Sequence, residues 1–118
     1  MTSEHLIPAD ATAAATLSAR EAGVFAGAAA FESAFRLTDA RITVEWRVVE
    51  GARFVAGETL GVVRGPARGI LTGERIALNF TQRMSGIATL TAEFVELVGG
   101  TNAAIADTRK TTPGLRAF

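Results

Sequence analysis

The stretch AAAFESAFRLTDARITVEWRVV, residues 28–49, passes from a helix-like to a strand-like spacing of apolar side chains. In residues 28–37 the apolar side chains recur at three- and four-residue steps, which is typical of a helix with one buried face. In residues 41–49 apolar and polar side chains alternate, which is typical of a half-buried strand. One strand face carries Ile42, Val44, Trp46 and Val48, and the other carries Arg41, Thr43, Glu45 and Arg47. The stretch therefore predicts a helix packed across the apolar face of an antiparallel sheet.

Further strands are predicted on both sides of this stretch. Residues 12–20 alternate between apolar and polar side chains and predict another half-buried strand. Residues 50–51, Glu-Gly, predict a turn, and residues 54–55 and 60–63 predict short strands after it. The first part of the chain is therefore expected to form an antiparallel sheet with a helix laid across it.

The pattern changes after Pro66. From residue 70 to residue 98 the apolar side chains fall at three- and four-residue steps, which predicts helix. Residues 85–86, Ser-Gly, predict an interruption, because glycine costs about 1 kcal/mol relative to alanine inside a helix. We therefore expect two helices that meet there. Residues 103–106, Ala-Ala-Ile-Ala, are apolar on both faces, which is typical of a buried parallel strand.

Together these segments predict the α+β fold class, followed by the opening of an α/β unit. We assign residues 1–84 to an N-terminal α+β domain and residues 85–118 to the beginning of the second domain. No internal repeat and no low-complexity linker separates the two.

Composition excludes several classes of protein. The 118 residues include 12 basic and 12 acidic side chains, so no basic surface for nucleic acid or an anionic membrane is indicated. The absence of cysteine excludes a disulfide framework and thiolate metal sites. No apolar run reaches the ~20 residues that a membrane-spanning helix needs. We therefore expect a cytoplasmic protein with neither a nucleic acid nor a membrane as its partner.

The strongest candidate site is DTRKTTPGLR, residues 107–116. It contains Lys110, the only lysine of the chain, beside Arg109 and directly after the predicted buried strand. A guanidinium group binds a carboxylate through two parallel hydrogen bonds, and an ammonium group acts as a compact point charge. Two adjacent cations at the end of a strand therefore suit a small anionic ligand. The pattern alone leaves open a basic loop that only contacts solvent.

Arg75 is a second candidate, near the start of the predicted helical region. A cation in the first turn of a helix is slightly unfavourable with the helix dipole, so a compensating partner is expected. That partner is either a bound carboxylate or an acidic side chain such as Glu74 or Glu58. The only histidine, His5, has no acid–base companion nearby, so we assign it a structural or solvent role.

Three ordered motifs resemble the quinolinate phosphoribosyltransferase family, also called carboxylating nicotinate-nucleotide pyrophosphorylase. They are TGERIALNF at 72–80, SGIAT at 85–89 and DTRKTTPGLR at 107–116. The earlier LIP at 6–8 and REAGVFAG at 20–27 resemble the opening domain of the same family. The resemblance implies a hammerhead-type N-terminal α+β domain, followed by the first helix and strand of an incomplete α/β barrel.

The resemblance also implies an activity in NAD biosynthesis. The family converts quinolinate and phosphoribosyl pyrophosphate into nicotinate mononucleotide, carbon dioxide and pyrophosphate. By motif match Thr108, Arg109 and Lys110 would line the quinolinate pocket, and Arg75 would enter the active site of the partner subunit in a dimer. Quinolinate is a dianion, so fixed cations would stabilise both the bound acid and the negative charge that develops as carbon dioxide leaves.

Magnesium is the cofactor that the resemblance implies, bound to the pyrophosphate group by a part of the barrel that these residues do not include. We assign no metal ligand and no certain catalytic residue to the sequence itself. Because members of the family are much longer, we expect the chain to be a fragment without measurable turnover.

Two alternatives stay open at this point. One is a related protein of the molybdenum-transport type, with a different substrate. The other is a non-enzymatic assembly domain, because a helix that normally packs on a barrel would expose Phe80, Met84 and Phe94 and favour oligomers. A biotin- or lipoyl-type carrier does not fit, because the only lysine lies beyond the predicted sheet.

Overall fold

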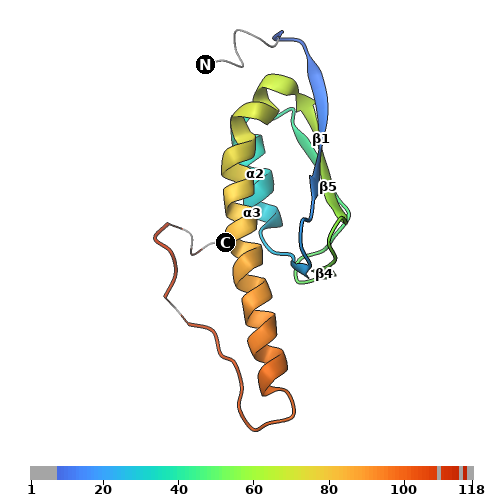
Figure 1. Ribbon diagram of the computed structural model, residues 1–118. Helices are drawn as coiled ribbons and strands as arrows, with labels where there is room; N and C mark the ends of the chain where they lie inside the picture. The colour runs from blue at the N-terminus through green and yellow to red at the C-terminus, as the bar shows by residue number, and fades with distance from the viewer. Residues whose placement is uncertain (1–7, 109, 115, 117–118) are drawn as a thin grey trace.

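The computed structural model of the protein describes residues 8–108, 110–114 and 116. In chain order the elements are β1 (Thr12–Ser18), β2 (Gly23–Val24), α2 (Ala28–Thr38), β3 (Thr43–Trp46), β4 (Arg53–Phe54), β5 (Thr59–Pro66) and α3 (Ala67–Val98). Figure 1 shows α2 and α3 side by side on one side of the strands, with α3 extending well past them. The predicted α+β class with an antiparallel sheet is confirmed.

The main sheet has β5 at its centre, with β1 on one side and β3 on the other, both antiparallel to it. β2 and β4 form a separate two-stranded antiparallel ladder. β3 is shorter than the strand predicted for residues 41–49, but the alternation is confirmed, because Val44 and Trp46 are half-buried whereas Thr43 and Glu45 are exposed.

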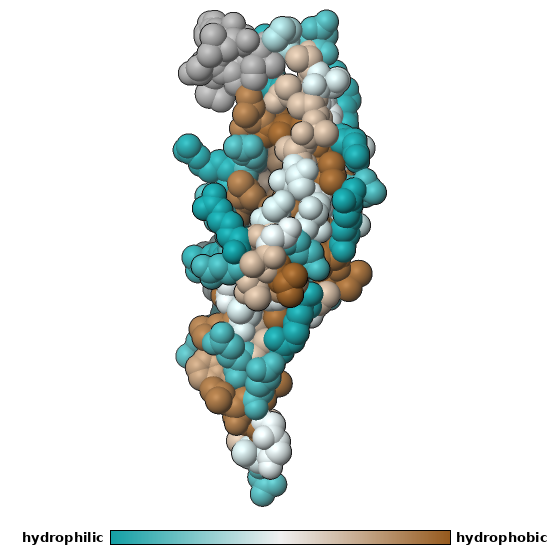
Figure 2. All heavy atoms as spheres, turned by 45° about the vertical axis from the view of Figure 1, so that its right-hand side comes forward, coloured by the Kyte–Doolittle hydropathy of each residue, from teal (hydrophilic) through white to brown (hydrophobic). Residues whose placement is uncertain are grey.

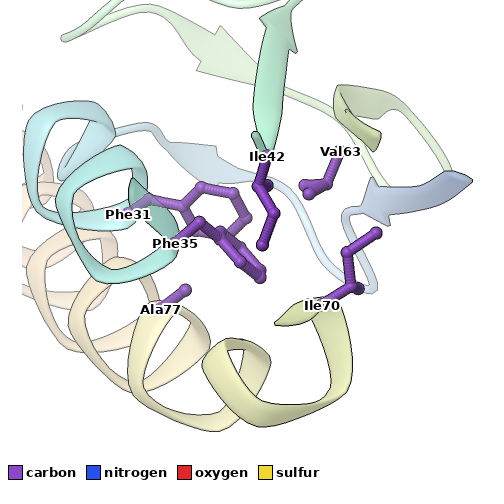
Figure 3. Close-up of a cluster of buried hydrophobic side chains, with 6 residues drawn as sticks. All are labelled: Phe31, Phe35, Ile42, Val63, Ile70 and Ala77. Atoms are coloured by element: carbon purple, nitrogen blue, oxygen red, sulfur yellow. The ribbon is translucent and has the colours of Figure 1, made fainter. Parts of the chain in front are cut away.

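The hydrophobic core lies between the sheet and the two helices, as Figure 3 shows. The buried residues of its main cluster are Phe31, Phe35, Ile42, Val63, Ile70 and Ala77. The ring centroid of Phe31 lies 5.1 Å from that of Phe35 and 5.1 Å from that of Trp46, both in edge-on geometry. Such aromatic pairs contribute about 0.5–1.5 kcal/mol beyond the burial of their area. The helical spacing of Phe31 and Phe35 thus places both rings in the core, as predicted.

The two helices approach each other closely at Gly73 of α3. A Cβ atom at this position would lie 3.0 Å from Phe35 Cδ1 and 3.2 Å from Thr38 Oγ1. Glycine is unfavourable inside a helix by about 1 kcal/mol relative to alanine. Here it leaves room for the ring of Phe35 against the backbone of α3, so the packing of α2 depends on it.

α3 is one continuous helix of 32 residues, and the predicted break at residues 85–86 is wrong. Gly86 is exposed, and a Cβ atom built there would have nothing within 4 Å. The preference of glycine for other conformations is outweighed because Ser85 and Thr89, on either side of it, form hydrogen bonds with the backbone of residues 24–26.

The C-terminal half of α3 exposes apolar side chains, and Figure 2 shows apolar atoms at this end of the molecule. They include Ile87, Leu90, Phe94, Val95 and Leu97. Of the three side chains that the sequence predicted to be exposed, Phe94 is exposed, whereas Phe80 and Met84 are half-buried. Across the described ranges, no helix combines the length and the apolar character that crossing a bilayer would require.

Candidate functional site

Arg75 lies in the third turn of α3, because the helix begins at Ala67 rather than near residue 70. The predicted first-turn location is therefore wrong, and the helix dipole gives no reason for a partner, since its effect is confined to the terminal turns. Arg75 is exposed, and within the described part of the chain it forms no ion pair with Glu74 or Glu58. Its guanidinium group is available to an anion from outside the chain.

The segment that follows α3 departs from the sequence-based prediction. Residues 103–106 are exposed and form no strand, so the predicted buried strand is wrong. A strand needs a neighbouring strand to pair its backbone N–H and C=O groups. Within residues 8–108, no strand of either sheet pairs with this segment. A short apolar run is therefore compatible with a strand but does not produce one by itself.

Two of the four predicted ligand-binding residues lie together in this exposed segment. Thr108 and Lys110 are exposed, and the backbone N–H of Lys110 donates to Thr108 Oγ1 at 3.2 Å. Arg109 lies outside the described residues. Neither Thr108 nor Lys110 lines the groove between α3 and residues 16–23 or the hollow beside the start of α2. Thr108 and Lys110 are thus presented to solvent.

The C-terminal motif returns to the helix that carries Arg75. In Figure 1 the segment after α3 turns back alongside that helix, and Arg83 Nη2 donates to Thr112 Oγ1 at 3.4 Å. Arg83 follows Arg75 by about two helical turns, which is ~12 Å along the axis. The structure therefore places the Lys110 segment beside α3, but the described residues show no contact between Lys110 and Arg75.

The position of α3 is fixed by side chains that the sequence analysis did not single out. Ser85 Oγ accepts a hydrogen bond from the Ala26 N–H and donates one to the Ala26 carbonyl, both at 3.0 Å. Thr89 Oγ1 accepts from the Val24 N–H at 2.9 Å and donates to the Ser85 carbonyl at 2.7 Å. A signal for this contact was present in the sequence, because Ser85 and Thr89 are four residues apart. This spacing places both hydroxyl groups on the same face of a helix.

Glycine at position 23 makes this contact possible. A Cβ atom there would lie 2.8 Å from Thr89 Oγ1 and 2.9 Å from the ring of Phe54. Since real Cβ atoms do not approach that closely, any larger residue would push α3 away from β2. The SGIAT motif and the REAGVFAG motif therefore correspond to the two sides of one helix–backbone contact.

Glu50 completes the N-terminus of α2, although the sequence analysis assigned it only to a turn. Its Oε1 accepts hydrogen bonds from the N–H groups of Gly27 at 2.8 Å and Ala28 at 2.6 Å. The first N–H groups of a helix have no partner within it, and a carboxylate also interacts favourably with the positive end of the helix dipole. This contact holds α2, and with it the aromatic core, against the turn after β3.

Two carboxyl groups that are not part of the candidate site have lowered pKa values because each forms an ion pair with an arginine. The side chain of Arg41 forms hydrogen bonds with Asp39 and lowers the pKa of that carboxyl group. Arg64 likewise lowers the pKa of Glu45 through a hydrogen bond across the sheet. Glu45 and both arginine side chains are exposed and Asp39 is half-buried, so each pair is in contact with solvent and contributes little to stability.

The described residues do not fit a magnesium site. No group of three histidine, aspartate or glutamate side chains in residues 8–108 and the described part of the C-terminal segment could hold a metal ion. A Mg²⁺ ion requires several oxygen ligands in octahedral geometry. No step of the chemistry is therefore assigned to a metal on this part of the chain.

Comparison with known proteins identifies the family. The family described as "Quinolinate phosphoribosyl transferase, N-terminal domain" matches residues 1–85, and "Quinolinate phosphoribosyl transferase, C-terminal domain" matches residues 87–118. The chain belongs to the quinolinate phosphoribosyl transferase family. The resemblance carried by the three sequence motifs is thereby confirmed.

Individual relatives agree with this assignment. The chain is 42% identical to the nicotinate-nucleotide pyrophosphorylase [carboxylating] of Mycobacterium leprae over 100% of its own length. It is 44% identical, over 98% of its length, to the mitochondrial quinolinate phosphoribosyltransferase [decarboxylating] 2a of Nicotiana tabacum. Its fold matches the crystal structure of NadC from Streptococcus pyogenes with a TM-score of 0.90 and 40% identity over 99% of the chain.

The chain spans less than half of each of these proteins. It covers 42% of the Mycobacterium leprae protein, 32% of the Nicotiana tabacum protein and 42% of the Streptococcus pyogenes structure.

Proposed function

We propose that this chain is the N-terminal portion of an enzyme that converts quinolinate and phosphoribosyl pyrophosphate into nicotinate mononucleotide, carbon dioxide and pyrophosphate. Its contribution is to supply the cationic side chains of Arg75, Arg109 and Lys110, together with the hydroxyl group of Thr108, to the quinolinate site. The observation that carries the proposal is that both halves of the family match in order, over residues 1–85 and 87–118.

The chemistry of the ligand suits these groups. Quinolinate carries two adjacent carboxylates, and a guanidinium group can bind a carboxylate through two parallel hydrogen bonds. Arg75 is exposed and Lys110 is exposed, so both are accessible to a ligand or to a second subunit. Cations fixed around the acid stabilise the negative charge that develops on the pyridine ring when carbon dioxide leaves.

The remaining features of the proposal follow from the family resemblance. We expect a homodimer or a higher homo-oligomer in which Arg75 enters the site of the partner subunit. Mg²⁺ is expected on the pyrophosphate group, held by residues outside this chain. A cytoplasmic location stays a prediction, since the relative from Nicotiana tabacum is named as mitochondrial.

The names of these relatives favour the carboxylating enzyme over the molybdenum-transport alternative. A non-enzymatic assembly role has one observation in its favour, namely the exposed apolar side chains along the end of α3, which include Phe94 and Leu97. Large exposed apolar patches mark interaction surfaces.

Isothermal titration calorimetry tests the proposal by measuring the affinity of the protein for quinolinate and for nicotinate. The protein is purified from its own organism, in the length that the organism makes. Quinolinate should bind more tightly than nicotinate, because nicotinate lacks one of the two carboxylates. Lys110→Ala should weaken quinolinate binding more than nicotinate binding. Equal affinity for the two acids, or none for either, would show that the cationic motif does not recognise a dicarboxylate and would favour the assembly role.

A further inference from the structure

Arg83 of α3 joins the segment around Lys110 to the body of the protein. Its Nη2 donates to Thr112 Oγ1 at 3.4 Å, and the two residues are 29 positions apart in the chain. Among the described residues 104–108 and 110–114, this is the one hydrogen bond that reaches a described residue outside the segment. The segment also pairs with no strand of the described structure. The contact with Arg83 therefore holds it beside α3 (Figure 1).

Two threonines flank Lys110 at equal spacing, Thr108 two positions before it and Thr112 two positions after it. The Lys110 N–H donates to Thr108 Oγ1 at 3.2 Å, which is a local turn that threonine side chains form with the backbone two residues on. Two residues of chain span at most about 7 Å, so the backbone of Lys110 lies within that distance of both threonines. One hydroxyl group thus shapes the backbone at Lys110, and the other attaches it to α3.

Arg83 lies on a part of α3 that is itself held in place. Two residues further on, Ser85 Oγ forms two hydrogen bonds with the backbone of Ala26. Arg83 is exposed and forms no ion pair with a described residue. A guanidinium group has five N–H donors and no acceptor, so it contacts the Thr112 hydroxyl oxygen as a donor. The anchored helix can therefore transmit its position to the segment that carries Lys110.

We propose that Arg83 is a positioning residue of the quinolinate site, which holds Thr112 and thereby keeps Lys110 at a fixed place beside α3. The inference rests on the proposed function, because it requires that Lys110 binds quinolinate. A segment without regular structure and a long lysine side chain lose conformational freedom when a ligand orders them, and this loss lowers affinity. A segment that is held before the ligand arrives loses less. Arg83 thus raises the affinity for quinolinate without contacting it.

The alternative is that Arg83 binds an anion directly, as a further cation beside Lys110. The two roles differ in what they require of Thr112. A positioning role needs the hydroxyl group of Thr112, because the bond to it holds the segment. Direct binding needs only the positive charge of Arg83. Variants at both ends of the bond therefore separate the two roles.

Hydrogen–deuterium exchange of the protein, in the length that its organism makes, tests the contact independently of activity. Arg83→Met keeps much of the apolar stem and removes the donor. The backbone N–H groups of residues 107–116 should then exchange about 3- to 10-fold faster, as expected when one hydrogen bond no longer opposes local opening.

Arg36→Met is the matched control for this measurement. Arg36 is also exposed, and its Nη2 donates to a hydroxyl oxygen, Ser33 Oγ, at 3.3 Å, but this contact lies within α2. Exchange in residues 107–116 should be unchanged in this variant. Equal exchange in Arg83→Met and Arg36→Met would show that Arg83 does not hold the segment, whatever the activity of the protein.

Isothermal titration calorimetry with quinolinate tests the consequence for binding. Arg83→Met and Thr112→Val should each weaken binding by about 3- to 10-fold, since each removes the same hydrogen bond. The double variant should bind no more weakly than either single variant. Thr112→Ser keeps the hydroxyl group and should bind as the wild type does. Losses that add in the double variant, or a loss in Arg83→Met without one in Thr112→Val, would assign Arg83 to direct anion binding and overturn the positioning role.

Steady-state kinetics separates positioning from a general disturbance of the fold. Arg83→Met should raise the KM for quinolinate and leave kcat within about twofold of the wild type, because saturating ligand orders the segment in both proteins. A lower kcat with an unchanged KM would contradict the positioning role. A wild-type protein that binds no quinolinate would overturn the proposed function and this role together. Wild-type binding with unchanged affinity in Arg83→Met would overturn this role alone.

Discussion

Ser85 and Ala26 are joined by two hydrogen bonds, because Ser85 Oγ accepts from the Ala26 N–H and donates to the Ala26 carbonyl, both at 3.0 Å. The two residues are 59 positions apart in the chain. A single hydroxyl group therefore pairs with both the N–H and the C=O group of one residue, as a residue of a neighbouring strand would. This contact orients α3, which carries Arg75, against the N-terminal sheet.

Replacing this hydroxyl group should destabilise the protein. Ser85→Ala leaves the N–H and the carbonyl of Ala26 without their partner, and because both residues are half-buried the cost should lie at the lower end of the range for an unsatisfied buried group, about 1 kcal/mol. Urea unfolding followed by circular dichroism would measure the loss. Thr72→Ala is the control, because Thr72 is exposed and its hydroxyl group bonds only within α3, to the Arg68 carbonyl. A Ser85→Ala variant no less stable than Thr72→Ala would show that the contact does not hold α3.

Two glycines of α3 should respond in opposite directions to alanine. Gly86→Ala should raise the free energy of unfolding by about 0.5–1 kcal/mol, because a Cβ atom there meets nothing within 4 Å and alanine favours helix. Gly73→Ala should lower it, because the new Cβ atom would lie 3.0 Å from Phe35 Cδ1. Thermal unfolding of both variants checks the prediction. A stabilising effect of Gly73→Ala would contradict the close packing of α2 on α3.

Glu50→Gln should weaken α2. The amide keeps an oxygen that can accept from Gly27 and Ala28, but the charge that interacts with the helix dipole is lost. We expect a loss of about 0.3–1 kcal/mol for Glu50→Gln and a larger loss for Glu50→Ala, which removes the acceptor as well. Denaturant unfolding of the three proteins would give this order. If the alanine variant were as stable as the wild type, the carboxylate would not cap α2.

Acid should remove the contribution of the Asp39–Arg41 ion pair. Because Arg41 lowers the pKa of Asp39 in the folded state, the pair stabilises the fold above the unfolded value of about 3.9. That contribution is lost as the pH falls through the lower folded pKa. The melting temperature of Asp39→Asn should therefore fall less steeply below pH ~4 than that of the wild type. Arg41→Gln should show the same reduced slope, and an unchanged slope in both variants would contradict the pairing.

Subunit mixing tests whether Arg75 and Lys110 act in one site from two chains. In the protein as its organism makes it, Arg75→Ala and Lys110→Ala should each lower kcat/KM by about 10- to 100-fold, since a hydrogen bond to a charged group contributes about 1.5–3 kcal/mol. Hybrid dimers formed by mixing the two variants should regain part of the activity, because one of their two sites is then intact. Mixing two preparations of the same variant is the control. If the hybrid dimers regained no activity, Arg75 and Lys110 would belong to the same subunit at each site, and the shared site would be contradicted.

The helix α2 and the strand β3 could be predicted from the sequence, because the spacing of apolar side chains in each matches the face that the fold buries. The alternation over residues 41–49 and the spacing of Phe31 and Phe35 each mark a buried face that the fold then uses. The break predicted at Ser85-Gly86 is wrong for the opposite reason. The glycine weakens the helix locally, but hydrogen bonds from Ser85 and Thr89 to residues distant in sequence hold it continuous.

The candidate site was harder to predict than the fold. The apolar run of residues 103–106 has the composition of a buried strand, yet burial depends on neighbouring strands that its own sequence does not supply. The first-turn location predicted for Arg75 is wrong because it depended on where α3 begins, and the ends of a helix are the part that a sequence pattern defines least well. The motif around Lys110 indicated an anionic ligand because it contains two adjacent cationic side chains, not because its sequence defines a local structure.

The most direct test is the release of labelled carbon dioxide from carboxyl-labelled quinolinate by the protein purified from its own organism. Release should require phosphoribosyl pyrophosphate and should fall strongly in Lys110→Ala, whereas the 118-residue chain alone should release none. Unchanged release in Lys110→Ala, or no release from the purified protein with both substrates present, would contradict the proposal that this part of the chain supplies cationic groups to quinolinate.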